Sequence, residues 1–230
     1  MDHDEERKDK IVSMETRAGL GLRVAAELRA YWDGVRGNRL VPPRSEINPR
    51  GIERALEFSF VLERVAPGMG RFRLAGMHLN DLMGMEVRGM PLTAFFTTTA
   101  RKAVADASEA AFREPAIVEA ELVSEAGAGR PVLSARLLLL PLRSDLGDVT
   151  RALGCLVAEG PVCRVPRRFE IKAIRIHPLT HDTVHLADSD HGFAMAPRPQ
   201  YAGFAEEKAT FEGAHSPEER RALFRVISGK

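Results

Sequence analysis

Apolar residues recur at helical spacing over residues 20–35. They follow one another at offsets of four, three and four, which places them on one face of an amphipathic helix. With the tryptophan beside it, this stripe consists of Val24, Leu28, Tyr31, Trp32 and Val35. Burying each large apolar side chain is worth about 1.5–3 kcal/mol, so the stripe must cover something. It covers either a second protein surface or, as a lid, the chain's own sheet.

Proline and asparagine mark the next elements. The segment VPPRSEINP predicts an extended linker, because proline lacks an amide donor and restricts the residue before it. Asn48 then offers an N-cap and Pro49 suits the first position of a short helix over 49–55. From Phe58 onward, apolar and polar residues alternate, and the turn at 67–70 predicts a β-hairpin.

The second half of the chain predicts a longer helix and three strands. Apolar residues share one face over 100–111, and any threonine of 97–99 could cap this helix. The predicted strands begin near Val118, Val132 and Ala152. A further piece, RFEIKAIRI, adds an edge strand or begins a C-terminal extension. The order favours an α+β fold: a five-stranded antiparallel sheet with helices on one face, preceded by the amphipathic N-terminal helix.

Composition and charge limit the cellular location and the classes of partner that we expect. The 33 lysines and arginines nearly cancel the 32 acidic residues, so no global field steers the chain to nucleic acid or to an anionic membrane. The charged N-terminus fits neither a signal peptide nor an anchor, and the longest apolar run is too short to span a bilayer. We expect a cytoplasmic protein with reduced cysteines and no nucleic-acid or membrane partner. The expected divisions are a flexible segment over 1–19, one domain over 20–176 and a tail over 177–230.

The order of elements resembles the PAS fold, and several motifs resemble a compact bacterial PAS family. The matching residues are Tyr31-Trp32, Pro43-Arg44, Ile47, Pro49, Ile52, the run Arg71-Phe72-Arg73-Leu74-Ala75-Gly76, Gly84 and Gly89. The chain departs from the pattern at Met77, where a small polar residue is expected. The resemblance implies a stand-alone regulator that acts by binding, pairs through its N-terminal helix as a homodimer or with a regulatory protein, and can host a small-molecule ligand.

Candidate chemistry is sparse. No linear motif of a hydrolase, metalloprotease or P-loop enzyme is present, so we expect no catalytic residues and no enzyme. Neither cysteine lies where the resemblance places a flavin-site cysteine, and the long helix lacks the histidine of haem-binding relatives, so no cofactor is expected. His78 is the histidine that could face a cavity; the alternative is a hydrogen-bonded histidine at a helix start.

A histidine-rich stretch follows the domain. His177, His181 and His185 repeat every four residues and would share a face if they were helical, where they could hold a divalent metal. Pro178 and the neighbouring threonines argue against such a helix, so a solvated tail is the preferred interpretation.

The leading hypothesis is therefore a non-enzymatic PAS regulator that binds a partner protein and, in addition, a small apolar or mixed ligand. The alternatives are a PAS sensor that carries haem or flavin, and a small enzyme without a linear motif.

Overall fold

The computed structural model describes residues 19–180, and the structural statements below concern this part of the chain. In chain order the elements are α2 (Leu20–Arg36), η1 (Arg44–Glu46), η2 (Pro49–Phe58), β1 (Ser59–Ala66), β2 (Met69–Ala75), α3 (Met77–Met83), η3 (Leu92–Phe95), α4 (Arg101–Arg113), β3 (Ala116–Ser124), β4 (Ser134–Arg143), β5 (Val149–Glu159) and β6 (Phe169–Pro178). The three η elements are 3-10 helices.

All pairings in the sheet are antiparallel, and its strand order is β2-β1-β5-β4-β3-β6. The predicted α+β class is confirmed, with six strands rather than five. The extra strand is β6, which pairs with β3 from Phe169 opposite Ser124 to Pro178 opposite Ala116. Ile171 and Ile174 pack against the core from this strand, which gives the edge position its hydrophobic stabilisation.

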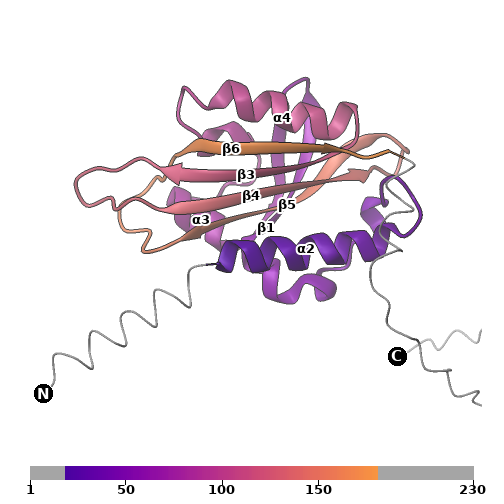
Figure 1. The fold of residues 1–230 in the computed structure, drawn as a ribbon, viewed down its shortest axis with the longest axis horizontal. Helices are drawn as coiled ribbons and strands as arrows, with labels where there is room; N and C mark the ends of the chain where they lie inside the picture. Colours follow the sequence, from indigo (N-terminus) through magenta and orange to yellow (C-terminus); the bar gives the residue numbers. More distant parts are fainter. Residues whose placement is uncertain (1–18, 181–230) are drawn as a thin grey trace, which may run out of the picture. The chain divides into compact units, whose positions relative to one another are not determined.

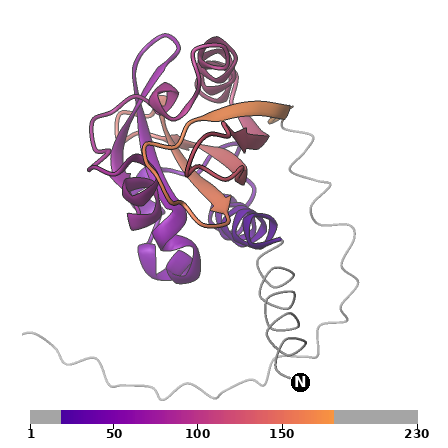
Figure 2. The ribbon, with the colours of Figure 1, turned by 90° about the vertical axis from the view of Figure 1, so that its left-hand side faces the viewer.

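Helices cover both faces of the sheet (Figures 1 and 2). The predicted helical layer corresponds to α3, η3 and α4, whereas α2 lies on the opposite face together with η2. Between the sheet and α4, Phe72 makes edge-to-face contacts with Phe60 and Phe95, at centroid distances of 5.2 and 5.4 Å. Gly154 makes room for this cluster, since a Cβ there would lie 2.5 Å from the Phe60 ring. Aromatic side chains therefore fill this layer.

The N-terminal helix folds back onto its own sheet. The sequence allowed either this lid arrangement or contact with a second protein. Val24, Leu28 and Trp32 are buried against β4 and β5. The Trp32 indole N–H donates to the carbonyl oxygen of Pro141 at 3.0 Å, so the buried polar atom has a partner. Of the two surfaces that the stripe could cover, the structure shows an apolar face of the chain's own sheet.

Of the two helix N-caps that the sequence predicts, the structure contains one. Asn48 caps η2 as expected, its side chain accepting a hydrogen bond from the Arg50 N–H. The predicted threonine cap of α4 was wrong: no side chain caps that helix. The hydroxyls of Thr97 and Thr99 instead donate to the Glu170 carboxylate on β6, which lowers the pKa of Glu170. These residues join the start of α4 to the edge strand.

Trp32 should dominate the stability of the α2 layer. We expect Trp32→Ala to lower the free energy of unfolding by about 3–5 kcal/mol through lost burial and a cavity. Trp32→Phe should cost less, about 1–2 kcal/mol, because it keeps a ring and loses the hydrogen bond. Urea denaturation followed by circular dichroism measures both. Leu22→Ala, at a position 56% exposed on the same helix, is the control and should change stability by less than about 0.5 kcal/mol. Equal effects at both positions would contradict the packing of α2.

Candidate ligand groove at the hairpin

A hollow with a mostly apolar lining lies between η2 and the β1–β2 hairpin. Its volume is about 840 Å³. Val61 and Leu153 form the sheet side, on the face that α2 also covers, and Ile47 and Ile52 form the opposite wall. We call it the hairpin groove; its lining is completed by Arg44, Pro49, Glu53, Arg54, Leu56, Glu57, Ser59, Phe60, Leu74, Ala75, Gly76 and Met77.

The rim of the hairpin groove is unusually apolar for a protein surface. Leu74 is 52% exposed and Met77 is 65% exposed, and Leu56 is also exposed on η2. These side chains come from three elements, η2, β2 and α3, and line one hollow. Single exposed apolar residues are common, but a contiguous apolar patch around a concavity indicates a binding surface.

Close backbone packing joins η2 to the end of the hairpin. The Gly76 N–H donates to the Ser59 carbonyl oxygen at 2.8 Å. A Cβ at Gly76 would lie 2.1 Å from the Glu57 carbonyl oxygen, so no larger residue fits without moving η2. The Ser59 hydroxyl donates to the Ala55 carbonyl oxygen at 2.7 Å, which closes the last turn of η2. The wall of the groove is thereby held in place.

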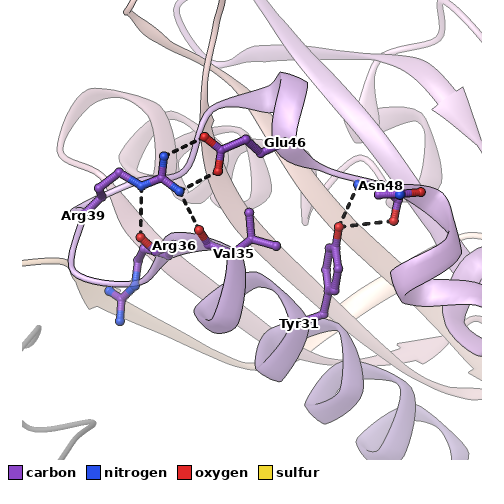
Figure 3. A network of polar contacts seen from close by, with 6 residues as sticks. All are labelled: Tyr31, Val35, Arg36, Arg39, Glu46 and Asn48. Atoms are coloured by element: carbon purple, nitrogen blue, oxygen red, sulfur yellow. Dashed lines mark hydrogen bonds and ion pairs between the residues drawn. The ribbon is translucent and has the colours of Figure 1, made fainter. Parts of the chain in front are cut away.

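The N-terminal helix holds η1 and η2 from the other side (Figure 3). The Arg39 guanidinium donates to both Glu46 carboxylate oxygens, at 2.8 and 2.6 Å, and to the carbonyl oxygens of Val35 and Arg36. The Tyr31 hydroxyl accepts a hydrogen bond from the Asn48 N–H at 2.7 Å. Both networks link the C-terminal half of α2 to the segment that carries Arg44 and Ile47.

The predicted interaction residues therefore have separate roles. Val24, Leu28 and Trp32 are core, and Val35 packs partly buried against them. Tyr31 is also partly buried, and its hydroxyl bonds to the backbone of Asn48. The stripe is thus satisfied within the chain, and pairing of two copies through α2 stays a prediction.

His78 has the structural role that was the alternative to a ligand role. It lies in the first turn of α3, and its Nε2 accepts a hydrogen bond from the Ala158 N–H at 3.0 Å. Its ring contacts Phe58 edge-on at 4.9 Å. Burial lowers the pKa of His78, and the nearby Asp81 carboxylate opposes this shift. The imidazole is therefore held neutral as an acceptor that fastens α3 to β5.

The other candidate functional residues, the histidines of the predicted metal site and the two cysteines, do not line the groove. His177 lies on strand β6 opposite Ile117, so a helical metal face cannot include it. His181 and His185 lie outside the described residues, as does nearly all of the predicted tail, so its boundary at 177 stays a prediction. Within residues 19–180, no group of three or more metal-binding side chains comes together. Cys155 is buried, which raises the pKa of its thiol to about 12, and Cys163 is exposed.

Sequence reasoning missed the hairpin groove. Its lining runs from Arg44 to Leu153, and no local pattern connects these segments. The single signal was Met77, the position where the chain departs from the family motif, which now proves to lie on the groove rim.

A family model described as a PAS domain matches residues 22–157, more than half of the chain. The chain belongs to the PAS domain family, and it is a PAS module of the sensory and signalling type. The resemblance inferred from its motifs is confirmed.

No curated protein matches this chain. A solved structure that it resembles is a distant one. The structure titled "Structure of an RNA-binding Light-Oxygen-Voltage Receptor" is 19% identical, with a TM-score of 0.35, over 51% of this chain and 36% of that chain. The match thus spans only about a third of that receptor. Separately, no helix within residues 19–180 is long and apolar enough to cross a membrane.

Protonation of His78 should destabilise the fold. The unfolded chain, with an ordinary histidine pKa of about 6.5, binds this proton more readily than the folded chain, so stability falls as the pH drops below about 6.5. Between pH 7.5 and 5.5 this contribution is at most about 1.4 kcal/mol. We expect His78→Gln to lose that part of the pH dependence, measured as urea unfolding at both pH values. If the variant keeps the wild-type change of unfolding free energy between these pH values, His78 does not titrate in this window.

Proposed function

We propose that this chain is a non-enzymatic PAS regulator that senses a small, largely apolar ligand in the hairpin groove and acts on a partner protein. The observation that carries the proposal is the groove, whose volume of about 840 Å³ lies in the range of small-molecule sites, about 300–1,000 Å³. Apolar atoms make up most of its lining surface. Such a surface binds apolar ligands because removing apolar area from water is favourable and non-directional.

The layer between the sheet and α4 does not fit a haem or flavin. Phe60, Phe72 and Phe95 occupy it at van der Waals contact, and a flat cofactor would have to displace them. The His78 Nε2 already accepts the Ala158 N–H, so it is not free to ligate iron without breaking that bond. These observations favour the hairpin groove over the sheet-to-helix layer as the ligand site.

The nucleophiles near the groove also favour binding over catalysis. The Ser59 hydroxyl is committed to the Ala55 carbonyl, and no histidine lines the groove. The Cys155 thiol is buried, and a pKa of about 12 keeps it protonated at neutral pH. A nucleophile needs an adjacent base or a lowered pKa, and neither residue has one.

Contact between the groove wall and α2 supports a route from ligand to partner. A ligand that displaced η2 would strain the Tyr31–Asn48 bonds and the Arg39–Glu46 pair, both of which end on α2 or directly after it. The helix lies on the outer side of the sheet, where a partner can reach it. The regulatory output is accordingly assigned to the exposed side of α2, and not to the buried stripe for which the sequence predicted the partner contact.

The freshly purified protein should be colourless. The filled aromatic layer leaves no place for a chromophore, and haem and flavin absorb through the cofactor itself. We expect no stoichiometric absorption band between about 370 and 450 nm. Such a band would instead support the cofactor-bearing sensor.

A neutral alkyl probe should bind in the hairpin groove. We expect 1-decanol to bind the wild type in isothermal titration calorimetry, and Leu74→Asp or Met77→Asp to weaken it about tenfold, because each puts a charge beside the alkyl chain. Leu146→Asp is the matched control, at a position 91% exposed in the β4–β5 turn. Absence of decanol binding, or equal loss in the control, would contradict the proposed site.

A further inference from the structure

A polar trough continues from the hairpin groove across the hairpin. Its volume is about 510 Å³, and it shares Arg44, Val61 and Leu74 with the groove. We call it the arginine trough because four arginines line it, namely Arg44, Arg73, Arg88 and Arg151. An apolar hollow thus passes directly into a basic one.

The charges of the arginine trough are not balanced within it. Glu63 pairs with both Arg73 and Arg151, the latter at 2.6 Å. Asp145 is the other carboxylate of the lining, and it is exposed in the β4–β5 turn. Four cations therefore face two anions.

Two of the four arginines have no side-chain partner among residues 19–180. In the part of the chain that the structure describes, neither Arg44 nor Arg88 makes an ion pair or a side-chain hydrogen bond. Arg44 is half-buried at the junction of the two hollows, and Arg88 is exposed. A half-buried guanidinium without a carboxylate is a ready donor for an anionic group.

The part of the groove lining that comes from η2 carries a net negative charge. Glu53 and Glu57 contribute two carboxylates from this element, and Arg54 contributes one guanidinium. A ligand with a negative head is therefore repelled at the η2 side and attracted at the trough. The charge distribution specifies the direction in which an elongated ligand lies.

We propose that the groove and trough together bind a single-chain amphiphile with an anionic head, its alkyl chain on the floor of Val61 and Leu153 and its head on Arg44 and Arg88. The head is a carboxylate or a phosphate, which present similar oxygen acceptors to a guanidinium. This inference rests on the proposed function, since it names the class of ligand for the same groove.

The test compares ligands that differ only in the head group. Decanoate, decyl phosphate and 1-decanol are titrated calorimetrically into the full chain, below the concentrations at which they form micelles. We expect the anions to bind at least about tenfold more tightly than the alcohol, the gain typical of one or two charge-assisted hydrogen bonds. The relative affinities of decanoate and decyl phosphate distinguish the two head groups.

Substitutions then separate the head from the chain. Arg44→Gln combined with Arg88→Gln should abolish the preference for the anions and leave decanol binding within about twofold. Arg101→Gln, an exposed arginine at the start of α4 on the other face, is the matched control and should change nothing. Leu74→Asp should weaken all three ligands. Thermal unfolding of each variant verifies that it is folded.

The outcomes are distinct. Equal affinity for decanol and the anions, or a preference that survives in the double arginine variant, overturns the anionic head and leaves the proposed function standing. Inorganic phosphate binding as tightly as decyl phosphate overturns the amphiphile, because the trough would then act alone. Failure of all three alkyl probes overturns the groove itself and the proposed function with it. Binding to phosphatidylglycerol vesicles in place of free decanoate also overturns the proposal.

Discussion

The burial of Trp32 is the contact on which the rest of the described structure depends. Its indole fills the space between α2 and the sheet, and its N–H satisfies the Pro141 carbonyl, so the helix has one favourable position. From that position Arg39 reaches Glu46 and Tyr31 reaches Asn48, which places η1 and η2. One wall of the hairpin groove is therefore positioned by a tryptophan that does not line the groove.

The two faces of the sheet have different roles. On one face, the phenylalanines and the alanine-rich side of α4 form a layer with edge-to-face aromatic contacts, and the ion pair of Arg64 with Glu109 ties the hairpin to that helix. On the other face α2 and η2 pack side by side on the apolar surface, and the groove lies between η2 and the hairpin. A well-packed layer provides stability, and the incompletely covered face is the one on which binding is proposed.

Apolar side chains exposed to water are energetically unfavourable, and so is a half-buried guanidinium without a carboxylate. Finding both around one hollow therefore indicates a binding site. Leu74 and Met77 would be better placed in a core, and they add an aggregation risk where they are. Arg44 lines both the groove and the arginine trough, half-buried and, within the described residues, without a carboxylate partner. One amphipathic ligand would relieve both features together, and neither feature contributes to the packing of the domain.

The sequence alone determined the elements and the family, because helical and strand periodicities are local and the PAS motifs are contiguous. It predicted α2, the hairpin, the long helix and three strands, and it showed that the stripe around Leu28 must be buried. It left β6 open, since nothing local distinguishes an edge strand from an extension. It missed the groove, since Leu56, Leu74 and Met77 are ordinary apolar residues until three elements bring them together. Tertiary structure alone decided what the stripe covers, because hydrophobic burial is non-directional and any matching apolar surface satisfies it.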